Sequence, residues 1–401
     1  MSRLTIVGGV YVERCIQPLW DAVYGSAGRG LHAVAPLLAE PPRLVSYVAA
    51  GMEASARSLA DAANAELEPH PSSDSISFDY FHPLATPRIA PAPSAIAQEA
   101  PIHVQGQVVL RYGMLEGTAV VDADVAVYDP QSAFDVEPFA KNGSRANRLA
   151  LVLNRREAWA LSGSSDPAEA ARALLATEAA EVVVIKLGAA GALVATSKGA
   201  ELVPLYRTER VWKIGSGDVF SSTFAALWGC RGMAPENAAD CASRATAWYC
   251  NTRTLPAPQL DELKHLVNTP LRPGAGRIYL ASPFFDISQR WFVEEARFDL
   301  RTLGAEVFSP VHAVGPGPAH MVAPADIEGL EQCDVVFANL NGLDPGTIFE
   351  VGYAVKKGIP VIALAQNTKD EDLKMVEGTG CEIVDDYASA IYRAVWRLPA
   401  K

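Results

Sequence analysis

The sequence lacks the features that are typical of membrane proteins, of secreted proteins and of proteins that bind nucleic-acid polymers. No apolar run approaches the roughly 20 residues that a membrane span needs. The opening residues, MSRLTIVGGVYVERC, contain a strand-like apolar run but no cleavable signal pattern. Acidic residues outnumber basic ones by 46 to 34, for a formal net charge of −12, so a basic face for a phosphate backbone is not expected. We expect a cytoplasmic protein that binds neither a membrane nor a nucleic-acid polymer.

Cysteine is also scarce. The six cysteines are scattered through 401 residues, with no CxxC pair and no Cys/His spacing of a zinc site. We therefore expect reduced, mostly buried thiols, and the metal ligands of the protein, if it has any, stay unknown at this point.

The composition is that of a folded protein with more than one core. Apolar residues make up 49% and charged residues 20% of the chain, which is typical of globular proteins. Single cores fade beyond roughly 250 to 300 residues, so 401 residues predict two domains. Short β-rich runs alternate with amphipathic helical patterns, which indicates α/β folds with parallel sheets.

The break in these patterns places the domain boundary. LPAPQ and PLRPGAGR interrupt all periodicity, and we expect a first domain at 1–255, a linker at 256–276 and a second domain at 277–401. A stretch rich in Pro, Ser and Ala at about 68–101 is expected to be an irregular surface excursion of the first domain.

The second domain reads as a small doubly wound parallel sheet of the flavodoxin or Rossmann type. We expect strands at 277–281, 305–310, 334–340 and 360–365, and helices at about 288–303, 324–332 and 347–357, with glycines at 304 and 358 ending two of the helices. Ligands of such sheets bind at the carboxyl ends of the strands. The loops SPFFD and NGLDPG should meet there.

Three carboxylates are candidates for chemistry at this edge: Asp326, Asp344 and Glu350. Departure of a nucleobase leaves an oxocarbenium-like sugar, which one carboxylate can trap while a second acid protonates the base. We expect Glu350 in the first turn of its helix, where the helix dipole would keep the carboxylate ionised. An ionised Glu suits a nucleophile.

The segments IYLASPFF, ADIEGLEQCD and DPGTIFEVGYA together resemble the nucleoside 2-deoxyribosyltransferase family over most of 277–365. The resemblance implies that Glu350 attacks the anomeric carbon, that Asp344 and Asp326 contact the sugar or the base, and that Tyr279 orients the nucleophile. It implies no metal or cofactor for this chemistry.

The same resemblance implies substrate contacts at Ser282, Phe284, Phe285 and Gly346, with the two phenylalanines as walls of a base pocket. Family transferases also complete a neighbour's site with their C-terminal end, and RAVWRLPAK does not match that ending. Hydrolysis and base exchange therefore both stay open.

The sharpest motif of the first domain is KIGSGDVFSSTFAALW. Gly215, Ser216 and Gly217 precede a helix that opens at Asp218. Such a turn can stabilise charge on a transferred phosphoryl group, and an Asp beside it can accept the proton of the attacking hydroxyl. The pattern predicts phosphoryl transfer.

This segment resembles the PfkB or ribokinase-like carbohydrate kinase family, together with other segments in the same order over about 3–252: IVGG, GSAGRG, YDPQ, NRRE and VVVIKLGAAGALVAT. The resemblance implies a ribokinase-like fold that uses ATP and Mg²⁺. Asp218 would be the catalytic base and Gly215, Ser216 and Gly217 the anion hole.

Further roles follow from the same resemblance. Asn154 and Glu157 would lie near the metal and the phosphates, while Glu13 and Gly28 would face the substrate. Family sugar kinases usually carry Asp where Glu13 stands and Asn where Gly30 stands. They also carry Asp-Thr-Thr where this chain has WKI at 212–214. Each lost hydroxyl partner would cost a sugar on the order of 1 to 3 kcal/mol, so either the substrate is not a simple hexose or pentose, or the kinase is weak.

The two domains together predict a bifunctional enzyme that acts on a small nucleoside, nucleotide or sugar. One domain would phosphorylate a hydroxyl, and the other would cleave or transfer at an N-glycosidic bond. The alternative is that one module, more plausibly the kinase-like one, is a silent nucleotide-binding or sensing unit. Both families are often oligomeric, which implies a homo-oligomer.

Overall fold

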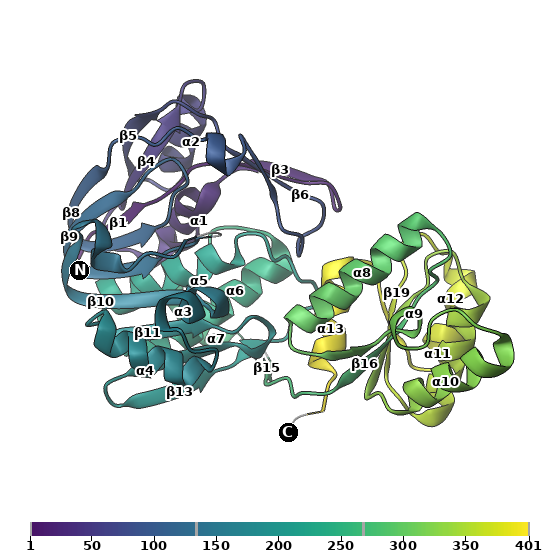
Figure 1. The fold of residues 1–401 in the computed structure, drawn as a ribbon. Coiled ribbons are helices and arrows are strands. Elements are labelled where there is room, and N and C mark those ends of the chain that lie inside the picture. Colours follow the sequence, from purple (N-terminus) through teal and green to yellow (C-terminus); the bar gives the residue numbers. More distant parts are fainter. Residues whose placement is uncertain (1, 133–134, 267–268, 400–401) are drawn as a thin grey trace. The chain divides into compact units, whose positions relative to one another are not determined.

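The computed structural model describes residues 2–132, 135–266 and 269–399. The chain forms two compact units (Figure 1). The N-terminal unit comprises Met1–Thr208 and Trp212–Pro270, and the C-terminal unit comprises Glu209–Val211 and Leu271–Lys401. The segment expected as a linker contains helix α7 (Leu260–His265), whose Leu263 is buried in a core of the N-terminal unit.

A nine-stranded sheet forms the centre of the N-terminal unit. Its strands lie in the order β13-β12-β11-β10-β9-β8-β1-β4-β5. Their bounds are β1 (Leu4–Val7), β4 (Arg43–Ala49), β5 (Glu66–Ser72), β8 (Ile102–Tyr112), β9 (Ala119–Asp129), β10 (Arg145–Asn154), β11 (Val182–Lys186), β12 (Ala192–Thr196) and β13 (Gly199–Val203). The strands pair in parallel from β5 to β11, and β12 and β13 pair antiparallel.

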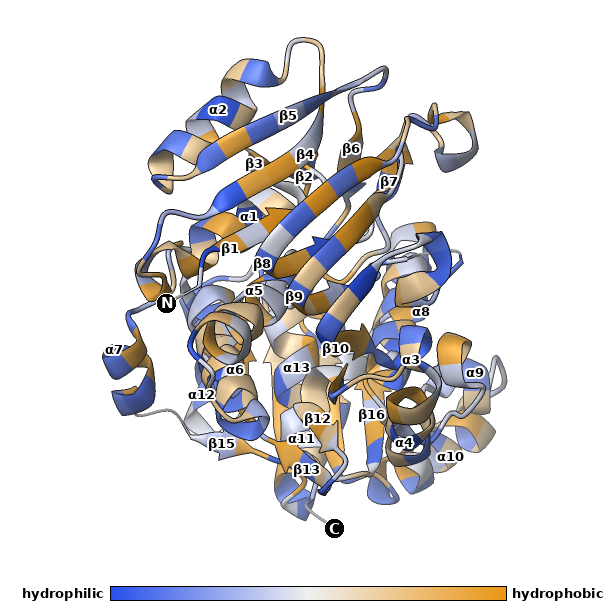
Figure 2. Cartoon of the chain, turned by 90° about the vertical axis from the view of Figure 1, so that its left-hand side faces the viewer, coloured by the Kyte–Doolittle hydropathy of each residue, from blue (hydrophilic) through white to orange (hydrophobic). Residues whose placement is uncertain are grey.

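Helices cover both faces of this sheet. Alternate side chains of β11 show why: Val182 and Val184 join one buried cluster, and Val183 and Ile185 join the other. A strand that is buried on both sides has a continuous apolar sequence. The first cluster includes residues of α1 (Gly25–Val34), α2 (Glu53–Ala62), α5 (Ser216–Phe224) and α6 (Pro235–Thr252), and the second includes residues of α3 (Arg155–Ser162) and α4 (Pro167–Thr177). Figure 2 shows β4 largely in hydrophobic colours and α2 banded with hydrophilic residues.

A second sheet corrects the expectation of an irregular excursion at 68–101. Strands β2 (Val12–Cys15), β3 (Trp20–Val23), β6 (Ser77–Tyr80) and β7 (Arg88–Ala90) form it in the order β3-β2-β6-β7. The prolines that suggested irregular structure include Pro69 and Pro71 of β5. Because β5 is at the edge of the large sheet, a strand residue without an N–H is tolerated there.

The C-terminal unit is an all-parallel doubly wound sheet, as predicted. Its order is β17-β16-β18-β19-β20, with β16 (Arg277–Ala281), β17 (Glu306–Phe308), β18 (Val335–Asn339), β19 (Val361–Leu364) and β20 (Glu382–Val384). The strand order reverses direction beside β16, so the crevice expected to bind ligands lies at the carboxyl ends of β16 and β18.

Within the described residues, six helices accompany this sheet: α8 (Ile287–Thr302), α9 (Pro310–Ala313), α10 (Ala319–Glu331), α11 (Pro345–Lys357), α12 (Asp370–Gly378) and α13 (Tyr387–Trp396). Helix α10 begins earlier than expected, at Ala319, so Pro324 lies inside it. Helix α11 also begins early, because Asp344 caps it and Pro345 suits the first helical position. None of the helices in the described ranges has the length and apolar character to span a membrane.

Candidate active sites

The C-terminal site is centred on a contact between β16 and α11. Tyr279 is fully buried, and its ring stacks on Phe308 with centroids 5.4 Å apart. Its hydroxyl donates a hydrogen bond of 2.6 Å to Glu350 Oε1, across 71 residues of sequence. The fold thus brings together the expected nucleophile and the residue expected to orient it.

The electrostatics of Glu350 differ from the expectation. Burial raises the pKa of Glu350 to about 7, the hydrogen bond from Tyr279 lowers it, and the charges of Asp326 and Asp344 raise it further. Because α11 begins at Pro345, Glu350 lies in the second turn, beyond the reach of the helix dipole. The carboxyl group is therefore partly protonated near neutral pH, and Tyr279, rather than the helix dipole, supports its ionised form.

The two aspartates differ in what they can offer a ligand. Asp344 caps α11, and its Oδ2 accepts hydrogen bonds from Thr347 N at 2.8 Å and Thr347 Oγ1 at 3.1 Å. Asp326, on α10, has a buried Oδ1 that finds no hydrogen-bond partner among the described residues. Burial raises the pKa of Asp326. A buried carboxyl oxygen without a protein partner is rare, and a ligand hydroxyl or ring nitrogen would satisfy it.

The expected substrate contacts are placed unevenly. Ser282 is buried after β16 and accepts a hydrogen bond of 3.2 Å from Asn339 Nδ2. The rings of Phe284 and Phe285 lie 5.1 Å apart, and Phe285 is 75% exposed. A Cβ added at Gly346 would lie 3.1 Å from Asp344 Oδ2, so glycine there leaves room for the capping carboxylate.

Two asparagines at this edge escaped sequence reasoning. Asn339 ends β18 and holds Ser282, and Asn341 Oδ1 accepts a hydrogen bond of 2.8 Å from the backbone of Gln366. The sequence could have indicated them, because polar residues that follow the apolar run VVFA are expected at the carboxyl end of a strand, where ligands bind.

The N-terminal site is built on the start of α5. Gly215 has a φ of 74°, and a Cβ added there would lie 2.1 Å from Arg29 Nε. Ser216 and Gly217 follow as the first two residues of the helix, and Asp218 is the third. Ser216 N donates to the carbonyl of Lys213, and Asp218 N donates to that of Gly215, both at 3.1 Å. Two backbone N–H groups at the expected anion hole are therefore already hydrogen-bonded within the turn.

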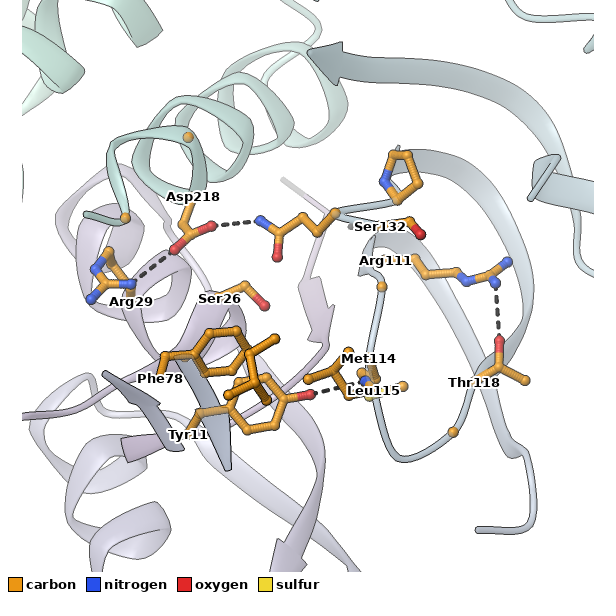
Figure 3. Close-up of a pocket in the computed structure, with 18 of the residues that line it drawn as sticks. Tyr11, Ser26, Arg29, Phe78, Arg111, Met114, Leu115, Thr118, Ser132 and Asp218 are labelled. Carbon is orange, nitrogen blue, oxygen red and sulfur yellow. Dashed lines mark hydrogen bonds and ion pairs between the residues drawn. The ribbon is translucent and has the colours of Figure 1, made fainter. Parts of the chain in front are cut away.

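Asp218 is held by a buried arginine that sequence reasoning did not assign. Arg29 is 1% exposed, and its Nη1 lies 2.9 Å from Asp218 Oδ2 and 3.0 Å from Glu13 Oε1. Gln131 Nε2 donates a hydrogen bond of 2.5 Å to Asp218 Oδ1. Figure 3 shows Arg29 joined to Asp218 in this pocket. A substrate hydroxyl must therefore displace Arg29 or Gln131 to reach the carboxylate, or share it with them.

A cavity of about 640 Å³ opens beside Asp218. Its walls include Phe78 of β6, Ser26 of α1 and Thr118 (Figure 3). Tyr80 of β6 also lines it. This volume is in the range of small-molecule sites. Gly28 packs against α2 instead, since a Cβ added to it would lie 3.0 Å from Leu59 Cδ1.

Asn154 and Glu157 form the start of α3. Glu157 N donates to Asn154 Oδ1 at 2.9 Å, and Asn154 N donates to Glu157 Oε2 at 2.7 Å. Burial, with the nearby charge of Asp129, raises the pKa of Glu157 to about 7. Asp129 is itself fully buried, and its Oδ2 lies 2.5 Å from Lys186 Nζ.

Comparisons with known families match both units. Residues 127–259 match the model of the pfkB family carbohydrate kinases, and residues 278–383 match the model of nucleoside 2-deoxyribosyltransferases. The chain thus has a PfkB-family kinase domain followed by a deoxyribosyltransferase-like domain, in the order that the sequence indicated. None of the curated proteins compared with the sequence matches it.

The chain also aligns with solved structures of kinases that have the ribokinase fold. A ribokinase from Thermotoga maritima aligns with a TM-score of 0.50 and 16% identity, over 66% of this chain and 98% of its own. A fructokinase from Vibrio cholerae O395, bound to fructose, ADP and calcium, aligns with a TM-score of 0.47 and 17% identity, over 66% of this chain and 98% of its own. The first alignment confirms the ribokinase-like fold class.

Proposed function

We propose that the C-terminal unit cleaves the N-glycosidic bond of a nucleoside or nucleotide, with Glu350 as the nucleophile. The observation that carries the proposal is the hydrogen bond of 2.6 Å from Tyr279 to Glu350 Oε1 at the ligand-binding edge of the sheet. The match of 278–383 to the deoxyribosyltransferase family supports it.

The chemistry divides between the carboxyl groups. The Glu350 carboxylate attacks the anomeric carbon, the C–N bond breaks, and its electron pair leaves with the base. The departing base takes a proton from water, and Asp326, whose buried Oδ1 has no hydrogen-bond partner among the described residues, binds the sugar or the base through that oxygen. Water or a second base then attacks the glycosyl ester and frees Glu350. The step needs no metal or cofactor.

The test is base release from a panel of nucleosides and their 5′-monophosphates, with chromatography as the readout. Glu350→Gln should lower the rate on the order of 10³-fold or more, because it removes the nucleophile. Glu377→Gln, on the exposed face of α12, is the matched control. A Glu350→Gln enzyme that releases base at the parent's rate overturns the assignment.

For the N-terminal unit we propose phosphoryl transfer from ATP to a hydroxyl of a nucleoside or sugar, with Asp218 as the base. The cavity beside Asp218 and the family match of 127–259 support this. Both units would then act on the sugar portion of the same class of molecule.

The acidic side chains near the expected phosphate site, Asp129 and Glu157, are poorly suited to hold the Mg²⁺ that the kinase family implies. Asp129 already forms an ion pair with Lys186, and Glu157 already accepts a hydrogen bond from Asn154 N at the start of α3. Among the described residues no group of three or more His, Cys, Asp or Glu side chains could hold a metal ion. Mg²⁺ is often held largely by substrate phosphates, and an ion bound in that way would need few ligands from Asp129 or Glu157.

A silent nucleotide-binding unit is the second candidate, and the ion pair of 2.9 Å between Arg29 and Asp218 favours it. Labelled ATP with a panel of nucleosides and sugars separates the two. Phosphorylated product that is lost in Asp218→Asn supports the kinase. ATP that binds without turnover on the whole panel supports the silent unit.

A further inference from the structure

Two lysines flank the start of α5, and none of the roles assigned so far uses Lys213. Lys213 Nζ lies 2.9 Å from Ser216 Oγ, in the first turn of the helix, and Lys213 lines the cavity beside Asp218. Lys186 Nζ lies 3.7 Å from the place where a Cβ at Gly217 would stand. Two ammonium groups therefore accompany the turn that is expected to bind phosphate.

The two lysines differ in how their charge is neutralised. Lys186 is paired with Asp129 at 2.5 Å. Lys213 makes no ion pair within the part of the chain that the structure describes. Burial, and to a smaller degree the charge of Lys186, lower its pKa, while Cys250 and Asp218 oppose that shift. Lys213 is partly buried, and among the described residues its ammonium group hydrogen-bonds only the Ser216 hydroxyl. Withdrawing such a charge from water is costly, and an anionic ligand would offset that cost.

The backbone of the turn raises the need for these cations. Two of its amides, Ser216 N and Asp218 N, already donate within the turn. A phosphate group bound there would gain fewer backbone hydrogen bonds than at an open helix start, so side-chain charge must supply more of the binding energy.

We propose that Lys213, backed by Lys186, binds the terminal phosphates of the donor polyphosphate, so that the unit binds ATP without a divalent metal. The ammonium group of Lys213 takes the place of the metal's charge, and Asp129, which could have served a cation, is already paired with Lys186. The ligand class is the polyphosphate chain of a nucleoside triphosphate. The proposal deepens the function proposed for this unit and rests on its phosphate site.

Titration calorimetry of the full chain with ATP, in EDTA and in Mg²⁺, tests the proposal. The parent dissociation constants in the two buffers should differ by less than about threefold, or about 0.7 kcal/mol. Lys213→Met should weaken binding in EDTA about 10- to 100-fold, the loss of one charged hydrogen bond. Lys213→Arg should retain most of the affinity, and Lys198→Met, at an exposed lysine of the same unit, should bind as the parent does.

Two outcomes overturn the proposal: ATP binding that requires Mg²⁺, or a folded Lys213→Met that binds ATP as tightly as the parent in EDTA. Thermal unfolding of each variant checks that it is folded. Phosphoryl transfer, measured separately, keeps the two ideas apart. Lysine-dependent binding in EDTA without transfer on any substrate supports the phosphate site and refutes the kinase, while transfer with metal-dependent binding does the reverse.

Discussion

Replacement of Tyr279 by Phe should shift the pH dependence of base release. The tyrosine hydroxyl is the side-chain donor that contacts Glu350 Oε1, at 2.6 Å. Its hydrogen bond favours the carboxylate, while burial raises the pKa of Glu350 to about 7. Phenylalanine keeps the stacked ring on Phe308 and removes only the donor. The pKa of Glu350 should therefore rise further.

The size of the shift follows from the strength of the bond. A hydrogen bond to a charged group contributes about 1.5 to 3 kcal/mol, which corresponds to about 1 to 2 pKa units. The pKa of Glu350 would then move from about 7 to roughly 8 or 9, values documented for buried Glu. At pH 7 the ionised fraction would fall from about one half to about 10% or 1%, so the rate should drop about 5- to 50-fold.

The assay is single-turnover base release between about pH 5 and pH 10. The parent should show a rising limb with a midpoint near the pKa of Glu350, about 7, and Tyr279→Phe should show the limb moved upward with the rate largely restored at high pH. Tyr353→Phe is the control, since Tyr353 lies on the same helix but donates to Glu331. A uniform loss at every pH, with the midpoint unchanged, would refute the reasoning.

Three further substitutions probe the packing, each followed by urea unfolding. Gly215→Ala should lower the unfolding free energy of the N-terminal unit by ~2–4 kcal/mol, because the new Cβ would lie 2.1 Å from Arg29 Nε. Gly163→Ala is the control: Gly163 has a φ of 77° and open space around it, so its loss should be only ~1–2 kcal/mol. Equal losses for the two variants contradict the clash. Arg29→Met should cost ~3–5 kcal/mol by leaving buried carboxylates without a cation, and adding Glu13→Gln should recover part of it; no recovery contradicts the pairing. Burial raises the pKa of Asp299 from 3.8 to about 7, so stability should fall as pH rises through that window, and Asp299→Asn should remove ~1–3 kcal/mol of the fall; identical pH profiles contradict it.

The fold was readable wherever a local pattern determined it. Strands β16, β17, β18 and β19 and the Gly358 helix end followed from apolar runs and a left-handed cap, whereas β20 was not predicted. The start of α11 was misplaced although Asp344 followed by Pro345 is a cap signal, and this error produced the wrong electrostatic expectation for Glu350. Strand β5 was missed because its prolines are tolerated only at a sheet edge, and a linear pattern does not reveal which strand is an edge.

The site residues divide in the same way. The family resemblance pointed to Tyr279 and Glu350, which the fold joins by a hydrogen bond. The partners of Arg29 could not be read, because its carboxylates lie 16 and 189 residues away along the chain. Such a contact depends on how α1 and α5 pack, which is a property of the assembled core.

The cysteines give each unit a reporter of its own. All six are free and buried: Cys15, Cys230, Cys241 and Cys250 in the N-terminal unit, Cys333 and Cys381 in the C-terminal unit. A thiol reagent modifies a buried cysteine when the structure around it opens. Pulse labelling of the intact, native chain, read by mass spectrometry of its peptides, would therefore measure the opening free energy of the kinase-family unit and of the deoxyribosyltransferase-like unit separately. No engineered probe is needed.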